Sequence, residues 1–296
     1  MVSRATLAVR SPAPLRPVDR LVLGYTAFST VVALARLPGY PAVGGVLVAN
    51  VLIVLLVALA RRADPGPAGR LARTLYPLLT LGAFYPAIDL LNHFGAVVVH
   101  DATVQRWELA LFGSAVSRTW WMTHPSPFWS SLLHGVYFAY YPIVLGPPLL
   151  FLAMGRSDAA ERSVLWLMAT FLACYAVFLL YPVAGPYYEY PRPSPVFLDN
   201  GPARLVYRTL ERGSAYGAAF PSSPVAATLV AAAAAWRGWR PLGAILLPLA
   251  VLLTVGVVYC QMHYAVDALA GAALALVLMP VLGGLAGEPG RRATGA

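Results

Sequence analysis

Eight long apolar runs constrain the fold of this chain more than any other feature. They cover residues 21–35, 42–60, 75–92, 128–153, 163–183, 221–236, 241–259 and 264–285. A transmembrane helix needs about 20 apolar residues. Of the 296 residues, 59% are hydrophobic and only 11% are charged, which excludes a disordered chain and an ordinary soluble enzyme. We therefore predict an all-α, polytopic membrane helix bundle with about eight transmembrane helices.

The distribution of basic residues predicts the orientation of the bundle. All 21 basic residues are arginines. With the N-terminus in the cytoplasm, the predicted cytoplasmic segments carry 14 of them and the predicted extracytoplasmic segments carry seven. This bias follows the positive-inside rule, so we expect both termini in the cytoplasm. The arginines are scattered between apolar runs and do not form one face, which argues against a nucleic-acid partner.

Two predicted extracytoplasmic loops, about residues 93–127 and 184–220, are long and rich in Trp, Tyr and Pro. Within the first loop, the stretch from Ala102 to Phe112 alternates apolar and polar residues in a way that favours a helix lying on the membrane surface. Long loops over a rigid bundle are common places for functional sites. We therefore expect the site at this face.

The strongest local signal opens the last apolar run, where the residues from His263 to Asp267 read HYAVD. The histidine and the aspartate stand at positions i and i+4 and share one face of a helix. An aspartate placed in this way holds one imidazole nitrogen and leaves the other free as a nucleophile or base. The alternative is a histidine that makes only a structural hydrogen bond. The functional interpretation is favoured because ionisable residues are costly in membrane spans.

A second signal precedes the alanine-rich run, where the residues from Phe220 to Pro224 read FPSSP. Ser223 can cap the following helix and Pro224 suits its first turn, which is a complete structural explanation. The free amides of a helix start, together with the hydroxyls of Ser222 and Ser223, also make a site for an anion. Both interpretations remain open from this stretch alone.

Taken together, the two motifs resemble those of the type-2 phosphatidic acid phosphatase superfamily. The closer resemblance is to the branch of inositol phosphorylceramide synthases and related bacterial lipid phosphotransferases, whose motifs read like FPSxHxA and HYxxDxxAG. This chain has FPSSPVA from Phe220 and HYAVDALAG from His263, and the run from Tyr181 to Pro186 is also similar to that branch. The resemblance covers about residues 75–285.

The resemblance implies a role for each motif residue. His263 attacks phosphorus and forms a phosphohistidine, and Asp267 orients the imidazole and balances its charge. Ser222 and the backbone amides around Ser223 hold the phosphoryl oxygens. Arg192, in an Arg-Pro pair that matches half of the family's first motif, is a further candidate for phosphate binding. The family is independent of metals and cofactors, and no metal-binding motif is found in the sequence.

The sequence departs from the family at a position that carries chemistry. The histidine expected to protonate the leaving group falls at Pro224, which has neither a titratable group nor an amide hydrogen. Loss of a general acid lowers a rate by about 10²–10⁴. The lysine of the first motif is absent, and Gly256 and Val257 replace a Ser-Arg pair. These last two differences are common in the phosphotransferase branch.

Other histidines are alternative proton donors. His93 lies four residues after Asp89 near the predicted extracytoplasmic end of the third helix, and His134 lies within the fourth. A structural role is the more common outcome for either histidine. A proline at position 224 is also consistent with an inactivated protein.

These observations predict four segments: a disordered cytoplasmic tail at 1–18, two N-terminal transmembrane helices at 19–74, a six-helix phosphatase-like or phosphotransferase-like membrane domain at 75–285, and a cytoplasmic tail at 286–296. The leading hypothesis is a bacterial plasma-membrane enzyme that acts on a membrane lipid or polyprenyl phosphate at the extracytoplasmic face. Water, or an alcohol or polyol acceptor, then receives the phosphoryl group. The alternatives are an inactive family member that binds anionic lipid or a partner protein, and a small-solute transporter.

Overall fold

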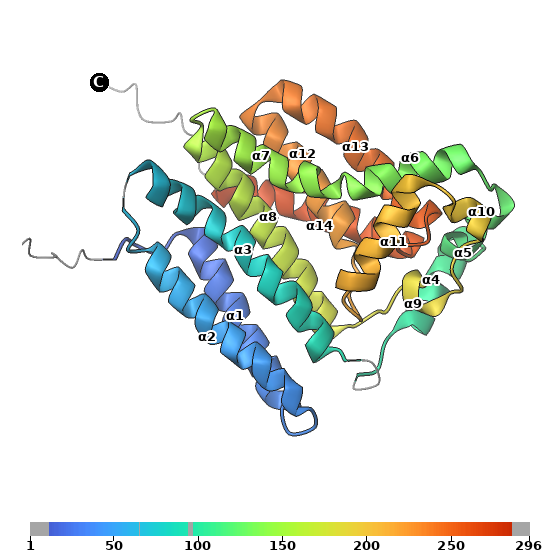
Figure 1. Ribbon diagram of the computed structural model, residues 1–296, viewed down its shortest axis with the longest axis horizontal. Coiled ribbons are helices and arrows are strands. Elements are labelled where there is room, and N and C mark those ends of the chain that lie inside the picture. The colour runs from blue at the N-terminus through green and yellow to red at the C-terminus, as the bar shows by residue number, and fades with distance from the viewer. Residues whose placement is uncertain (1–11, 65, 94–96, 286–296) are drawn as a thin grey trace, which may run out of the picture.

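The computed structural model describes residues 12–64, 66–93 and 97–285 (Figure 1). Residues 1–11 and 286–296, which belong to the two predicted tails, lie outside the described residues. The described part is a bundle of long helices with a group of shorter helices gathered at one end. The predicted all-helical membrane architecture is therefore confirmed.

The predicted apolar runs all form helices. They are α1 (Pro17–Arg36), α2 (Gly44–Ala60), α3 (Pro67–Leu91), α6 (Pro127–Phe138), α7 (Tyr140–Ala153), α8 (Ser157–Leu180), α12 (Ser223–Gly238), α13 (Arg240–Tyr259) and α14 (Ala265–Leu285). Among the described residues, seven segments are long and apolar enough to cross a membrane, and α6 with α7 forms one of them. The remaining predicted span, residues 221–236, corresponds to α12, which has only 16 residues.

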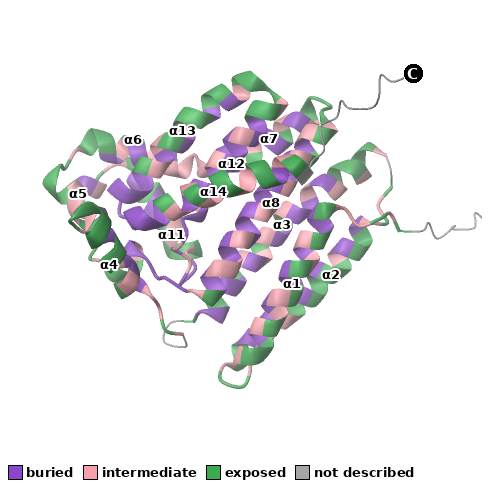
Figure 2. Ribbon diagram, turned by 180° about the vertical axis from the view of Figure 1, so that it is seen from behind, coloured by how far each residue is buried: buried purple, intermediate pink, exposed green. Residues whose placement is uncertain are grey.

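The alanine-rich helix α12 lies inside the bundle, in contact with α7, α8, α13 and α14. Ten of its residues are buried, six of them alanines. Small side chains let helix backbones approach closely, which is why this segment tolerates such a surrounded position. Figure 2 shows the contrast with the outer helices, whose outward faces are exposed and apolar. In a bilayer those outward faces contact lipid.

The chain alternates between two ends of the bundle. At one end, Arg16 bonds to the carbonyl oxygen of Arg73, and Arg156 donates a 3.0 Å hydrogen bond to the carbonyl oxygen of Gly238. At the other end, Arg36 donates to the carbonyl oxygens of Leu91 and Leu179. The short helices belong to this second end: α4 (Asp101–Phe112), α5 (Val116–Thr123), α9 (Pro186–Glu189), α10 (Pro195–Leu198) and α11 (Gly201–Gly213). The two long predicted loops are therefore largely helical.

The predicted span 128–153 is interrupted at Ala139, between α6 and α7. Pro142 lies in the first turn of α7 and has no N–H, so it cannot donate to the carbonyl oxygen of Phe138 as a continuous helix requires. The helix ends and restarts at this point. Tyr137, in the last turn of α6, lines a cavity between the helices.

Candidate functional site

The two sequence motifs lie against each other at the end of the bundle that carries the short helices. The backbone N–H of Ser222 donates a 2.9 Å hydrogen bond to the carbonyl oxygen of Asp267. Gly271, one turn further along α14, lies so close that a Cβ atom there would be 2.4 Å from the carbonyl oxygen of Ser222. The glycine therefore permits the start of α12 and the first turns of α14 to touch.

A tight turn after α13 presents His263. The backbone N–H groups of Met262 and His263 both donate to the carbonyl oxygen of Val257 at 2.9 Å, and Gln261 adopts a positive φ of 59°. The side chain of His263 is only 8% exposed. Its Nδ1 lies 3.0 Å from the carbonyl oxygen of Ala219 and 3.5 Å from Oδ2 of Asp267. A carbonyl oxygen only accepts, so Nδ1 carries the proton and Nε2 is left with its lone pair.

Asp267 lies behind the imidazole and is fully buried. Its Oδ2 accepts a 2.9 Å hydrogen bond from the backbone N–H of Tyr264, while its Oδ1 has no partner among the described residues. A buried carboxylate oxygen without a donor is costly. It is well placed to stabilise a positive charge that develops on the neighbouring imidazole.

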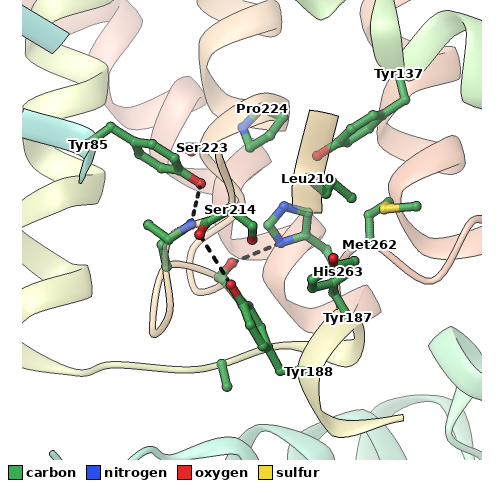
Figure 3. A pocket seen from close by; sticks show the side chains of 14 residues that line it. Tyr85, Tyr137, Tyr187, Tyr188, Leu210, Ser214, Ser223, Pro224, Met262 and His263 are labelled. Atoms are coloured by element: carbon green, nitrogen blue, oxygen red, sulfur yellow. Dashed lines mark hydrogen bonds between the residues drawn. The ribbon is translucent and has the colours of Figure 1, made fainter. Parts of the chain in front are cut away.

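A cavity of about 60 Å³ opens in front of His263 (Figure 3). Ser223, Pro224 and Met262 line it together with His263, and four tyrosines, Tyr85, Tyr137, Tyr187 and Tyr188, form much of the remaining wall. The imidazole nitrogen opposite Nδ1 points into this space. The cavity therefore places a nucleophilic nitrogen next to the start of α12.

The two serines of the FPSSP stretch have different positions. Ser222 is the residue that caps α12, with its Oγ 3.5 Å from the backbone nitrogen of Val225. This corrects the expectation that Ser223 is the cap. The difference arises because the helix already begins at Ser223, whose side chain instead faces the cavity. Ser222 does not line the cavity, so Ser223 is the serine available to a ligand.

Two acidic residues that the sequence interpretation did not single out hold this region together. Asp101 is buried at the start of α4 and accepts 2.8 Å hydrogen bonds from the backbone N–H groups of Ala184 and Gly185. It also accepts the hydroxyl of Tyr264 at 3.0 Å. Burial first, and the nearby charge of Asp101, raise the pKa of Tyr264, so that its hydroxyl remains a donor.

Glu108 is the second of these acids and is also fully buried. Its Oε1 accepts a 2.9 Å hydrogen bond from the backbone N–H of Ala265, the first residue of α14, and the carboxylate also holds Ser117 of α5. The predicted helix at Ala102–Phe112 is thus present as α4, with its acids turned inward. Their spacing of seven residues, which places both on one helix face, is the signal that could have identified them.

Arg192 lies apart from the cavity. Its guanidinium pairs with Glu211 at 2.9 Å and lies 5.5 Å from the centre of the Tyr207 ring. The side chain is 55% exposed and does not line the cavity. The structure therefore does not bring Arg192 together with His263, and phosphate binding by this residue stays a prediction.

The two alternative proton donors also lie away from the cavity. His93 stacks on Tyr40 with ring centres 4.6 Å apart. Asp89 does not pair with His93 but accepts a 2.8 Å hydrogen bond from the backbone N–H of Tyr216. His134 is fully buried, with its Nδ1 2.7 Å from the carbonyl oxygen of Ser130. Neither histidine lines the cavity in front of His263.

The electrostatic character of the cavity comes from neutral groups. No arginine is among the residues that line it. The positive contribution is the N-terminus of α12, and the side chain of Ser223, the first residue of this helix, lines the cavity. Throughout the described ranges, no group of three or more His, Cys, Asp or Glu side chains is arranged to hold a metal ion. Any anion bound here would meet hydroxyls and a helix terminus.

Comparison with known protein families supports the resemblance seen in the motifs. The model of the PAP2 superfamily matches residues 102–281, more than half of the chain, from α4 to α14. The match begins further along the chain than the predicted start at residue 75, so α1, α2 and α3 lie outside it. No curated protein and no solved structure matches the chain.

Proposed function

Because the chain belongs to the PAP2 superfamily, we propose that it is an integral membrane enzyme that cleaves a lipid-linked phosphate through a phosphohistidine at His263. The family match and the apolar spans identify it as a membrane protein of the lipid phosphatase type. One observation carries the catalytic part of the proposal. The Nδ1 of His263 is held by Ala219 beside Asp267, and the other nitrogen faces the cavity.

In the proposed reaction, Nε2 of His263 attacks phosphorus while the bond from phosphorus to the lipid oxygen breaks. The imidazole becomes positively charged, and the carboxylate of Asp267 stabilises that charge from 3.5 Å. The hydrogen bond from Nδ1 to Ala219 keeps the ring in its orientation through the step. Positioning and electrostatic stabilisation are the main requirements of phosphoryl transfer.

The phosphoryl oxygens require donors, and the proposal assigns them to the start of α12. Ser223 contributes its hydroxyl, and the N-terminus of α12 contributes the positive end of the helix dipole. Ser222 acts indirectly, because its Oγ caps the helix and its N–H bonds to Asp267. This division replaces the expectation that Ser222 touches the phosphate.

The second half of the reaction transfers the phosphoryl group from His263 to an oxygen nucleophile. Water gives hydrolysis, and an alcohol or polyol gives the phosphotransferase activity of the inositol phosphorylceramide synthase-like branch. The resemblance of FPSSPVA and HYAVDALAG to that branch favours transfer. With the arginine-rich end of the bundle in the cytoplasm of a bacterial cell, the cavity opens on the extracytoplasmic face.

Trapping the intermediate tests the proposal. The purified protein is incubated with phosphatidic acid, prenyl diphosphate and phosphoinositide substrates carrying labelled phosphorus, then quenched in base. We expect an acid-labile label on the wild-type chain and none on His263→Ala. His124→Ala is the matched control, since this exposed histidine bonds Thr123 and does not line the cavity. Equal labelling of wild type and His263→Ala, or no turnover of any substrate by either, would contradict the proposal.

The absence of the expected histidine supports a second candidate function, an inactive family member that binds anionic lipid or a partner protein. Pro224 lines the cavity in that position. Turnover measurements separate the active enzyme from the inactive family member. They compare three forms: the natural chain, Pro224→His, and Pro224→His combined with His263→Ala. If only Pro224→His turns over substrate, the natural chain is an inactive family member. Activity of the natural chain shows that another group supplies the proton.

A further inference from the structure

The oxygen that leaves with the lipid must lie where the polar and apolar parts of the substrate meet. Behind the small cavity at His263 is a second cavity of about 560 Å³, within the size range of ligand pockets, between α3, α6, α7, α8 and α11. Its wall is mostly apolar and aromatic. Five residues line both cavities: Tyr85, Tyr137, Leu210, Ser223 and Pro224. A substrate with its phosphate at His263 and its tail in the larger cavity has its bridging oxygen beside these five residues.

Three of the five boundary residues carry a hydroxyl, and their hydrogen bonds distinguish them. The hydroxyl of Tyr85 accepts a 3.4 Å hydrogen bond from the backbone N–H of Ala215. Ser223 belongs to the start of α12, where the phosphoryl oxygens are expected. The hydroxyl of Tyr137 makes no hydrogen bond to any residue that the structure describes. In Figure 3 this hydroxyl points toward the side of the cavity where His263 lies.

The other two tyrosines of the cavity do not reach the boundary. Tyr188 donates its hydroxyl to the carbonyl oxygen of Ser214 at 3.2 Å, and it lines only the smaller cavity. Tyr187 also lines only the smaller cavity. Of the two phenols that line both cavities, the Tyr85 hydroxyl is held at the backbone N–H of Ala215, whereas the Tyr137 hydroxyl is held by no described residue.

We propose that the phenol of Tyr137 protonates the leaving group, in the role for which Pro224 has no chemical group. The inference rests on the proposed phosphohistidine reaction and names its proton donor. As Nε2 of His263 bonds to phosphorus, the bond to the lipid oxygen breaks and that oxygen takes the proton of the Tyr137 hydroxyl. The lipid leaves as a neutral alcohol and Tyr137 is left as a phenolate.

The second step returns the proton. Water, or an acceptor alcohol, attacks the phosphohistidine and gives its proton to the Tyr137 phenolate, while the bond from phosphorus to Nε2 breaks. His263 and Tyr137 are then in their starting states, and all protons and electron pairs are accounted for. Tyr137 lies in the last turn of α6 and lines both cavities, which is what allows this assignment.

The test compares two substrates that differ in their need for a proton. Dioctanoyl phosphatidic acid releases an alkyl alcohol, whereas 2-nitro-4-octylphenyl phosphate releases a nitrophenol that departs readily as an anion. We expect Tyr137→Phe to lower turnover of the first about 10²-fold or more and turnover of the second by no more than about threefold. A structural defect would lower both rates equally, and that result would overturn the proposal.

Matched variants complete the test. Tyr85→Phe and Tyr187→Phe remove neighbouring phenols, and we expect the ratio of the two rates to stay at its wild-type value. A selective loss with either of them, or no loss with Tyr137→Phe, would refute the assignment to Tyr137. Adding Pro224→His to Tyr137→Phe should restore phosphatidic acid turnover at least tenfold. The His263→Ala trapping experiment separates these outcomes from failure of the proposed reaction itself.

Discussion

The backbone N–H of Ser222 donates a 2.9 Å hydrogen bond to the carbonyl oxygen of Asp267. This bond joins two motifs that are more than 40 residues apart in the chain and fixes the start of α12 against the start of α14. His263, which precedes α14, is therefore positioned relative to Ser223 by backbone contacts. A site held in this way depends on close approach of the two helices.

Gly271 is the residue that permits this close approach, and Gly271→Ala tests it. A Cβ atom there would lie 2.4 Å from the carbonyl oxygen of Ser222, which is backbone and has little freedom to move. We expect a destabilisation of about 1–3 kcal/mol and a loss of turnover. Gly24→Ala is the control, because this glycine of α1 has no atom within 4 Å of the added carbon. Thermal unfolding in detergent measures both, and equal melting temperatures would contradict the prediction.

Asp267→Asn tests the electrostatic role of the buried carboxylate. The asparagine oxygen can still accept the N–H of Tyr264, so the fold should persist. The negative charge beside the His263 imidazole is lost, and we expect phosphohistidine formation to slow by about 10²–10⁴. Asp89→Asn, on a carboxylate that does not line the cavity, is the control. Similar labelling rates for the two variants would show that the charge of Asp267 is not needed.

Asp101→Asn tests how α4 is held over the site. The Asp101 side chain accepts three hydrogen bonds, from Ala184, Gly185 and the hydroxyl of Tyr264. The asparagine amide would place its own N–H groups against donors that the carboxylate now accepts. We therefore expect a destabilisation of about 1–3 kcal/mol. The control is Asp199→Asn, which removes one member of an exposed pair with Arg204 and should change stability by less than about 1 kcal/mol. Denaturant or thermal unfolding distinguishes them, and a smaller effect at Asp101 than at Asp199 would be contrary to expectation.

Arg192→Ala and Ser223→Ala compare the two remaining phosphate-binding candidates. Arg192 is in an exposed pair with Glu211, so its removal should change both stability and KM little. Ser223 lines the cavity, so loss of its hydroxyl should raise KM or lower kcat by about tenfold, as expected for a lost hydrogen bond to a charged group. Steady-state kinetics decide between them. A larger effect of Arg192→Ala would restore the assignment made from the Arg-Pro pair.

Hydropathy predicts the helices well because burial in a bilayer imposes a long and nearly uninterrupted apolar signal. The predicted spans 42–60 and 241–259 correspond closely to α2 and α13. The interruption at Ala139 was missed, because a proline in the first turn of a helix does not lower the hydropathy of the run. The conversion of both long loops into short helices was also not predicted, apart from α4, since their helices are stabilised by contacts with the bundle.

The pairing of the HYAVD and FPSSP motifs follows from the sequence, because an i, i+4 spacing fixes His263 and Asp267 on one face and local signals mark the start of α12. Which serine faces the cavity, and which phenols lie at the boundary with the apolar cavity, depends on helix packing. Such contacts join residues distant in the chain, as Tyr137 and Ser223 are, and local patterns carry no information about them. The sequence thus predicted the spans and marked His263 as the candidate nucleophile, whereas only the tertiary structure decided which groups surround His263.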